Sequence, residues 1–184
     1  MNLQDFDALM KSHHPGQWPK EWQLFLEFCE AYFRNRLIEN PIVVELGVER
    51  NNQKAHYERY LGARHIGIDI STGFSTPEIV GDTHDQATLE KLKTTLGGKQ
   101  INLLFIDANH GYEDVKMDYE MYGPLTRNII ALHDVMTSFF GVKDFWSELL
   151  KSKEHTKFLF YNWSSRVNAV RQSFQYGIGL LIKE

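Results

Sequence analysis

The sequence predicts an α/β protein with a doubly wound, mostly parallel sheet of seven strands that ends in an antiparallel hairpin. Four short apolar runs each end on an acidic residue, at 42–45, 65–69, 101–107 and 129–134. Continuous runs of this kind are typical of strands buried on both faces. Segments with helical spacing separate the runs, and this alternation indicates a parallel sheet. Two late apolar segments lack a helix between them, which predicts the hairpin.

The acidic residues at the ends of these runs are the main indication of function. In a parallel sheet every strand points the same way, so the carboxyl ends of the strands meet at one rim. Open α/β sheets bind their ligands at that rim. We therefore expect these acids to face a common crevice, although they are scattered along the chain.

The first 40 residues are predicted to form a helical lead-in packed on the core, and residues 41–184 the main domain. Residues 1–16 are expected to be a loose segment closed by His13, His14, Pro15 and Gly16. Large apolar residues then recur at helical spacing, and Pro19 suits the first turn of a helix. We predict a helix over 19–37 that covers the sheet.

The elements of the main domain follow from apolar spacing and from glycine and proline stops. The first strand follows Pro41, and a weaker strand is expected near 77–80. Helices are predicted over 53–60, 88–96, 113–122 and 142–151. The late strands are expected at 157–163 and 176–183. Their connection contains Trp163, Arg166 and Arg171, which are candidates for the mouth of a substrate site.

Composition narrows the choice of partners and compartment. The 184 residues carry a net charge of −4 with a pI near 6.1, which gives no basic footprint for nucleic acid. The single cysteine, Cys29, cannot form a disulfide within the chain and suits a reducing compartment. No signal peptide or membrane span is apparent. We expect a cytoplasmic protein with no nucleic acid or membrane partner.

Three residues near the first strands are candidate contacts for a nucleotide. Gly47 follows the first strand, where a glycine permits a tight turn and a close approach of ligand to backbone. Asp69 lies about 20 residues further on, where a carboxylate can accept both hydroxyls of a ribose. Asp82 would lie near the adenine. The alternatives are an ordinary strand-to-helix turn for Gly47, a turn acid for Asp69 and a helix N-cap for Asp82.

A second group of residues predicts activation of a hydroxyl. Asp107, His133 and Asp134 come from the ends of adjacent strands and can share one cation. His110 follows at the start of a helix and can face the same crevice. A divalent metal lowers the pKa of a bound alcohol, and a histidine is the usual acceptor of its proton. The alternative is that these residues are loop acids and caps.

On these motifs the chain resembles class I S-adenosylmethionine-dependent methyltransferases. Within that superfamily it is most similar to the metal-dependent O-methyltransferases related to macrocin O-methyltransferase, some of which are named cephalosporin hydroxylase. The resemblance spans roughly residues 42–181 and is most specific after the fourth strand. The segments that support it are Val44–Val48, Gly67–Ile70, Gly81–Asp82, Phe105–Asp118, His133–Val135 and Gly141–Trp146.

The resemblance implies a single-domain Rossmann-like methyltransferase fold in which residues 41–184 bind S-adenosylmethionine and carry the catalytic site. It places Glu45 and Gly47 at the methionine end of the cofactor and Asp69 at the ribose. Asp82 is then near the adenine, and Asp107 also borders the cofactor. Asp107 and Asp134 match metal-ligand positions for a divalent cation, magnesium or manganese, and His110 matches a catalytic base. The implied activity is methylation of a hydroxyl on a small molecule such as a sugar, polyketide or other secondary metabolite.

The sequence departs from the family pattern at two places. Residues 49–52, Glu-Arg-Asn-Asn, stand where relatives carry a glycine-rich turn, and the full G-x-G-x-x-G fingerprint is absent. His133 stands where relatives often have a second acid, and a nitrogen ligand would favour Mn²⁺ or a later transition metal over Mg²⁺. It is also open whether His133 is a ligand at all.

Two other functions remain open from the sequence. A degenerate methyltransferase fold could serve as a non-catalytic binding protein, which the missing glycines would favour. Asp107, His110 and His133 also offer the two histidines and one carboxylate of a non-haem iron oxygenase, although the strand pattern argues against that fold. The methyl acceptor is not determined by the sequence, and a homo-oligomer remains open.

Overall fold

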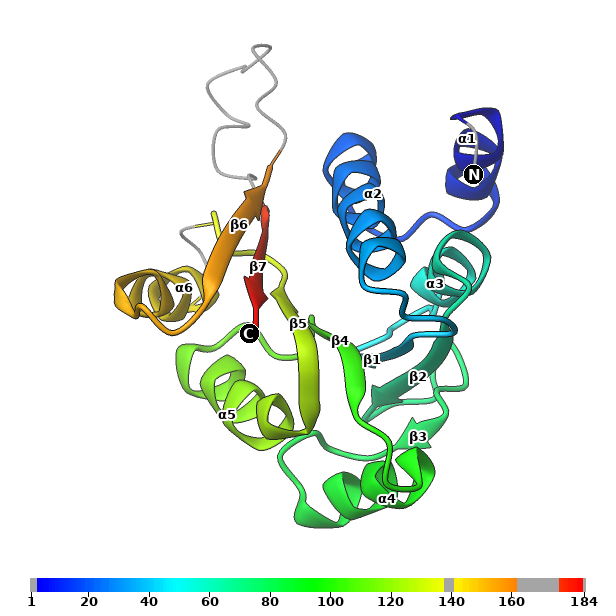
Figure 1. Cartoon of the computed structure of the whole chain (residues 1–184). Helices are drawn as coiled ribbons and strands as arrows, with labels where there is room; N and C mark the ends of the chain where they lie inside the picture. The colour runs from blue at the N-terminus through cyan, green and yellow to red at the C-terminus, as the bar shows by residue number, and fades with distance from the viewer. Residues whose placement is uncertain (1–2, 138–140, 162–175, 184) are drawn as a thin grey trace.

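The protein has a central sheet with helices on both faces, seen here in a computed structural model that describes residues 3–137, 141–161 and 176–183 (Figure 1). The strands are β1 (Ile42–Leu46), β2 (Arg64–Asp69), β3 (Ile79–Val80), β4 (Ile101–Ile106), β5 (Thr126–Leu132), β6 (Thr156–Phe160) and β7 (Ile178–Ile182). The helices are α1 (Leu3–Ser12), α2 (Pro19–Asn35), α3 (Gln53–Leu61), α4 (Gln86–Leu96), α5 (Tyr112–Tyr122) and α6 (Val142–Lys151), with a 3₁₀ turn, η1, at Gly123–Leu125.

The sheet has seven strands in the order β3-β2-β1-β4-β5-β7-β6. The first five strands in the chain are parallel to one another. Only β7 runs antiparallel, to β5 on one side and to β6 on the other. The predicted architecture is therefore confirmed, including the antiparallel strands at the end of the chain. Most of the connection between β6 and β7 lies outside the described residues, and so do Trp163, Arg166 and Arg171.

Alternate residues of each strand build two separate hydrophobic layers, because successive side chains point to opposite faces of a sheet. In β4, Leu103 and Phe105 pack on one face, whereas Leu104 and Ile106 pack on the other. The first face is covered by α1, α2 and α3, and the second by α4, α5 and α6. The N-terminal helices thus share one core with the main domain, and the boundary at residue 40 stays a prediction.

The first helix corrects the expectation of a loose segment over residues 1–16. Residues Leu3–Ser12 form α1. Phe6, Leu9 and Met10 are 4%, 3% and 7% exposed, and their spacing of three and four residues places them on one face of a helix. The stripe is short and is surrounded by acidic and basic residues, so it gives only a weak helical signal in the sequence. The segment is held by burial of that face against the core.

The other predicted helices are found within a few residues of their expected limits. Pro19 lies in the first turn of α2, which ends at Asn35 rather than at residue 37. Gly62 and Gly97 end α3 and α4 with φ of 61° and 59°. That left-handed conformation is accessible to glycine without the clash that a Cβ would cause.

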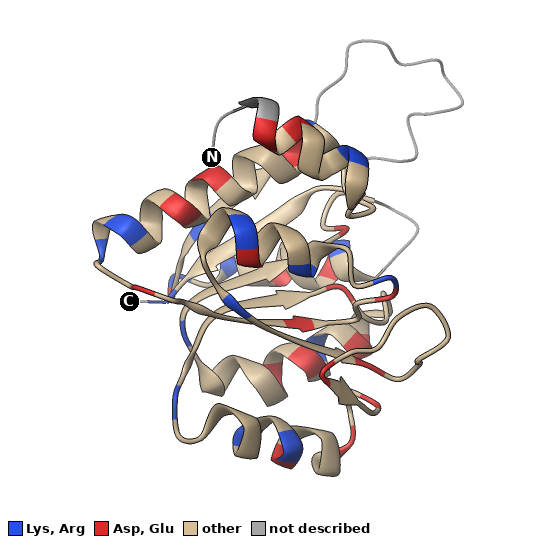
Figure 2. Ribbon diagram, turned by 90° about the vertical axis from the view of Figure 1, so that its right-hand side faces the viewer, with Lys and Arg blue, Asp and Glu red and all other residues tan. Residues whose placement is uncertain are grey.

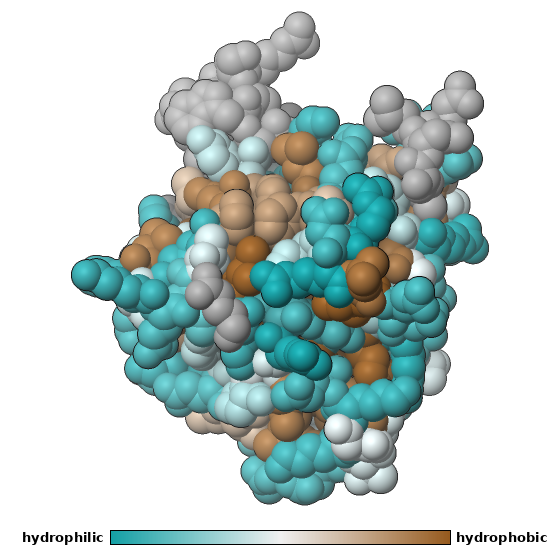
Figure 3. Space-filling model, viewed as in Figure 1, coloured by the Kyte–Doolittle hydropathy of each residue, from teal (hydrophilic) through white to brown (hydrophobic). Residues whose placement is uncertain are grey.

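Strand β6 forms one edge of the sheet and carries part of the exposed apolar surface. Phe158 and Leu159 are each 37% exposed, and Figure 3 shows apolar side chains on the face that includes this strand. On the inner side, the Phe158 ring lies 4.7 Å from the Phe28 ring of α2. The edge strand is therefore held to α2 by aromatic contacts. Across the described residues, none of the helices combines the length and apolar character of a membrane span.

We predict that Phe105→Ala lowers the free energy of unfolding by about 3–5 kcal/mol, the usual cost of deleting a fully buried phenyl ring. Phe105 is 0% exposed, and its ring lies 5.8 Å from Trp22 and 5.6 Å from Phe25. The measurement is urea denaturation followed by circular dichroism. Phe74→Ala is the matched control, because Phe74 is 70% exposed. Equal losses in the two variants would contradict a shared core between α2 and the sheet.

Candidate functional site

A cavity of about 800 Å³ lies at the carboxyl ends of the parallel strands. Backbone hydrogen bonds beyond the strand ends align three loops there, from Gly47 N to Ile68 O (2.8 Å), from Asp107 N to Leu46 O (2.9 Å) and from His133 N to Ile106 O (3.1 Å). Most of the predicted site residues line this cavity, namely Gly47, Asp69, Asp82, Asp107, His110, His133 and Asp134. Three of the four strand-end acids, Asp69, Asp107 and Asp134, therefore share one crevice, as the strand pattern indicated.

Glu45 is the exception among the predicted cofactor contacts. Its side chain is fully buried, and Oε2 lies 2.9 Å from Nε2 of His65. Burial raises the pKa of the Glu45 carboxyl, although His65 acts to lower it. Glu45 shares a sheet face with Val43, which packs against α2. It is therefore directed into the layer of α1, α2 and α3, and it does not line the cavity.

Gly47 is required by the close approach of two loops. Its φ is +80°, and an added Cβ would lie 2.3 Å from the carbonyl oxygen of Asp107 and 2.6 Å from Cα of Ala108. Any side chain would push the two loops apart. The glycine thus brings the turn after β1 against the chain that carries Asp107.

The turn after Gly47 keeps a glycine-like shape without further glycines. Glu49 and Asn51 have φ of 41° and 55°, a region that costs most side chains about 1–2 kcal/mol. Oδ2 of Asp69 accepts hydrogen bonds from the backbone N–H of Val48 (3.0 Å) and of Glu49 (2.9 Å). These bonds offset the strain and fix the turn beside the cavity.

Asp69 consequently has less capacity for a ligand than the sequence suggested. Its Oδ1 accepts a third backbone hydrogen bond, from Ser71 N at 2.8 Å. A carboxylate has about four acceptor positions, so room for about one further hydrogen bond remains. Asp82 has one oxygen engaged, by His84 N at 2.9 Å. Asp82 is not a helix N-cap, because Asp85 holds that position in α4.

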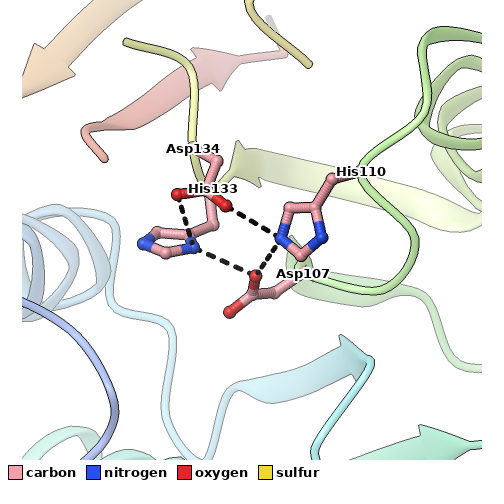
Figure 4. A group of neighbouring side chains, drawn as sticks. All are labelled: Asp107, His110, His133 and Asp134. Atoms are coloured by element: carbon pink, nitrogen blue, oxygen red, sulfur yellow. Dashed lines mark hydrogen bonds and ion pairs between the residues drawn. The ribbon is translucent and has the colours of Figure 1, made fainter. Parts of the chain in front are cut away.

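Four side chains converge at the ends of β4 and β5 (Figure 4). One ligand atom from each of Asp107, His110, His133 and Asp134 lies within 4.8 Å of all the others. Nδ1 of His133 lies 3.0 Å from Oδ1 of Asp107 and 3.4 Å from Oδ1 of Asp134. Nε2 of His110 lies 2.8 Å from Oδ2 of Asp134 and 3.4 Å from Oδ1 of Asp107. The two imidazoles therefore bridge the two carboxylates.

The backbone and the aromatic residues around the cluster hold these groups in place. Asp134 has φ of 62°, a left-handed conformation that its short polar side chain tolerates better than most. The His133 ring stacks between Phe105, at 6.4 Å, and Tyr176, at 5.7 Å. His110 lies in the loop before α5 and is the most exposed of the four, at 32% of its side chain. It is the member best placed to meet a ligand in the cavity.

The cluster retains protons when no cation is bound. The hydrogen bonds to Asp107 and Asp134 raise the pKa of His110 to about 10. Burial acts to lower the pKa of His133, but the neighbouring Asp107 and Asp134 carboxylates raise it overall. Burial would raise the pKa of Asp107, but His133 and His110 together lower it. His110 is therefore positively charged at neutral pH, and the same carboxylates favour the protonated form of His133.

The same four residues fit a divalent cation. Two carboxylates and two imidazoles form a common donor set for first-row transition metals. Oδ1 of Asp134 is buried and accepts no hydrogen bond from the described residues, so one oxygen is available to a cation. Nε2 of His133 also lacks a hydrogen bond within that part of the chain, but Figure 4 shows it directed away from the cluster. A cation would have to displace the histidine protons.

Gln17 is a site residue that the sequence did not reveal. It is 3% exposed, and its Nε2 donates a hydrogen bond to Oδ2 of Asp107 at 3.1 Å. Pro15 and Gly16 also line the cavity, and Asn52 donates from Nδ2 to the carbonyl of His14 at 2.9 Å. The segment before α2 thus closes one side of the cavity. A single glutamine in a polar stretch gives no periodic signal that could have placed it there.

Comparison with known sequences does not establish a family for this chain. No protein-family model matches the chain. A curated sequence, the uncharacterised protein y4gI of Sinorhizobium fredii (strain NBRC 101917 / NGR234), is 31% identical over 85 residues. That match covers 44% of this chain and spans only 8% of the length of that protein.

Solved structures of methyltransferases share the fold. The O-methyltransferase TomG of Streptomyces achromogenes, in complex with SAM, superposes with a TM-score of 0.63 at 14% identity, over 100% of this chain and 92% of that one. An O-methyltransferase of Bacillus cereus in complex with SAH superposes with a TM-score of 0.56 at 12% identity, over 100% of this chain and 92% of that one. MycE of the mycinamycin biosynthetic pathway, in complex with Mg and SAH, superposes with a TM-score of 0.64 at 15% identity, over 98% of this chain and 55% of that one. The chain therefore shares the Rossmann-like fold of these methyltransferases.

We predict that the His110 imidazole of the metal-free protein titrates with a pKa near 10 instead of 6.5. Because the folded pKa is the higher one, its ion pairs stabilise the fold fully below about pH 6.5, and that contribution is lost as the pH rises through about 10. The substitution Asp134→Asn should lower the pKa of His110, because it removes one of the two carboxylates that stabilise the charged imidazole. Nuclear magnetic resonance of the imidazole protons, assigned with His110→Asn, measures both values. An unshifted His110 would contradict the ion-paired geometry.

Proposed function

We propose that this protein is an S-adenosylmethionine-dependent O-methyltransferase that uses a divalent cation and acts on a hydroxyl of a small molecule. The observation that supports this most is the cluster of Asp107, His110, His133 and Asp134, which opens on the cavity at the carboxyl ends of the parallel strands. TomG is bound to SAM, and MycE to Mg and SAH. The more specific assignment to the branch of macrocin O-methyltransferase is part of the same proposal.

The charge of the cavity suits a sulfonium cofactor. Among the described lining residues there are six carboxylates and no lysine or arginine, the acids being Glu49, Asp69, Asp82, Asp107, Asp114 and Asp134. Such a lining attracts a cation. The methionine end of the cofactor would meet the backbone at Gly47, a ribose hydroxyl would donate to Asp69, and the adenine would lie near Asp82. Asp107 would border the cofactor, whereas Glu45 would act only by supporting the sheet beneath it.

Asp107 and Asp134 would hold the cation, with His133 as a third ligand through Nδ1. A bound divalent cation would lower the pKa of the acceptor hydroxyl and orient its oxygen. Because the donors would be two carboxylates and an imidazole, we expect the site to bind Mn²⁺ more tightly than Mg²⁺, which favours oxygen ligands. Gln17 would keep Asp107 oriented through its hydrogen bond to Oδ2.

His110 would act as the general base. Once a cation takes the place of its proton beside Asp107 and Asp134, Nε2 of His110 could accept the proton of the acceptor hydroxyl. A bound S-adenosylmethionine would supply the methyl group to the acceptor oxygen, with the sulfonium sulfur as the leaving group. Proton acceptance by a positioned side chain contributes roughly 10²–10⁴-fold. Alignment of the two substrates in the cavity would supply much of the remaining acceleration.

The two alternative functions differ from this proposal in what they bind. A non-catalytic methyltransferase fold would bind the cofactor without turnover. Glu49 and Asn51 in the turn after Gly47 have positive φ, as residues of a glycine-rich turn would. This backbone shape favours a turn that can still hold a ligand. An iron oxygenase would need bound Fe²⁺ and an oxidisable co-substrate such as 2-oxoglutarate.

We predict that S-adenosylmethionine binds to the protein and that Asp69→Asn weakens the binding by about 1–3 kcal/mol, the cost of losing a charged hydrogen bond. Isothermal titration calorimetry with S-adenosylmethionine measures this. Asp144→Asn, an exposed acid of α6, makes the same charge change away from the cavity and should leave the affinity unchanged. Unaltered binding by Asp69→Asn would exclude the ribose contact, and absence of binding by the wild type would exclude the methyltransferase function.

We predict that Asp107→Asn abolishes binding of Mn²⁺, whereas His110→Ala retains it. Electron paramagnetic resonance of free Mn²⁺ gives both affinities, with Asp144→Asn as the control.

Against an acceptor found by screening hydroxylated small molecules for methylation, His110→Ala should lower turnover roughly 10²–10⁴-fold because the base is lost. Full methyl transfer in the presence of a strong chelator would refute the metal mechanism. Fe²⁺-dependent consumption of 2-oxoglutarate would establish the oxygenase instead.

A further inference from the structure

A second cavity lies at the opposite end of the sheet and has the opposite charge. Its volume is about 970 Å³, and it is formed where β1, β2, β4 and β5 begin and where β7 ends. Figure 2 shows the separation, with basic residues gathered toward the end of the molecule marked by the C-terminus and acidic residues toward the other. This polarity is unexpected in a chain whose net charge is −4.

The cations of this second cavity come from separate parts of the chain. Its lining contains Arg36, Arg64, Lys99, Arg127 and Lys183 and a single acid, Glu39. Arg36 follows α2, Arg64 begins β2 and Lys99 precedes β4, while Arg127 lies in β5 and Lys183 follows β7. The fold therefore brings together charges that no local motif of the sequence contains.

These cations are not neutralised by neighbouring acids in the described part of the chain, where none of the five takes part in an ion pair within 4.0 Å. Two are fixed by backbone carbonyls instead. Arg64 Nη2 donates to Thr95 O at 3.2 Å, and Lys183 Nζ donates to Gly123 O at 2.8 Å. Like charges that face one cavity repel one another, and a bound anion would relieve that repulsion.

Two polar residues of the neutral lining are fixed by hydrogen bonds. Asn102 accepts a hydrogen bond from Ile42 N at 2.8 Å and donates one to Oδ1 of Asn128 at 2.9 Å. These side chains fix the floor of the cavity between β1, β4 and β5. Arg36, Lys99 and Arg127 are exposed above it. The Arg36 guanidinium lies over the Tyr32 ring, 4.7 Å from its centroid, whereas Lys99 and Arg127 make no described side-chain hydrogen bond.

We propose that this cavity binds a small polyanion with two or more phosphate groups. Guanidinium groups match phosphate oxygens in pairs, and a lysine adds a point charge. The cavity has the volume of a small-molecule site, and its concave form favours a compact ligand over an extended surface partner. This second site is separate from the acidic cavity and does not depend on the proposed methyl transfer.

The test is isothermal titration of the full-length protein with sodium tripolyphosphate in the presence of EDTA, so that divalent cations do not contribute. We expect saturable binding of one ligand per chain that weakens as salt is added. The double variant Lys99→Gln/Arg127→Gln should weaken it about tenfold or more, because charge-assisted hydrogen bonds to phosphate are lost. Both residues are exposed and make no described side-chain hydrogen bond, so the fold should be retained.

The matched control is Arg59→Gln/Lys143→Gln, which removes the same charge from exposed positions of α3 and α6. Unchanged affinity in this control, with weakened binding in the first double variant, supports the site. Equal weakening in both variants would show general electrostatic attraction and overturn it. Absence of saturable binding at millimolar tripolyphosphate would overturn it as well. Equal affinity for sulfate would contradict the requirement for more than one phosphate group.

Discussion

The arrangement of the cavity at the carboxyl ends of the strands depends on two neighbouring carboxylates, the partly buried Asp107 and the buried Asp134. Carboxylates in such positions must be paired or they become neutral. Here each is paired with both His110 and His133. The left-handed backbone at Asp134, the aromatic rings beside His133 and the loop that carries His110 all position the groups of this pairing. The glycine at position 47 and the amide of Gln17 then complete the packing around Asp107.

The sequence predicted the sheet well because the information for it is local. Continuous apolar runs define buried strands, and the acids at their ends meet wherever the strands are parallel. The orientation of a side chain at a strand end is harder to predict, because it alternates from one residue to the next. Glu45 is an example. It lies near the carboxyl end of β1, but its side chain points to the same face of the sheet as that of Val43, toward α2. Gln17 and α1 were missed because their places depend on tertiary contacts rather than on the local pattern.

The missing glycines after β1 illustrate how a functional turn can be maintained by a different physical means. A glycine-rich turn adopts positive φ freely, whereas Glu49 and Asn51 must be held there. Asp69 holds Glu49 through its hydrogen bonds to two consecutive N–H groups. The same carboxylate is the one proposed to contact the ribose. If that proposal holds, one side chain would couple the shape of the turn to the recognition of the cofactor, a link that a motif search cannot detect.

The ion-paired cluster imposes one further condition on the proposed chemistry. Protonated histidines and a divalent cation neutralise the same carboxylates, so they compete for them. A base with a pKa near 10 cannot accept a proton at neutral pH. His110 becomes competent only when another positive charge takes its place beside Asp107 and Asp134. On this argument the cation has two functions, since it would activate the acceptor hydroxyl and release the base, and neither function would be available without the other.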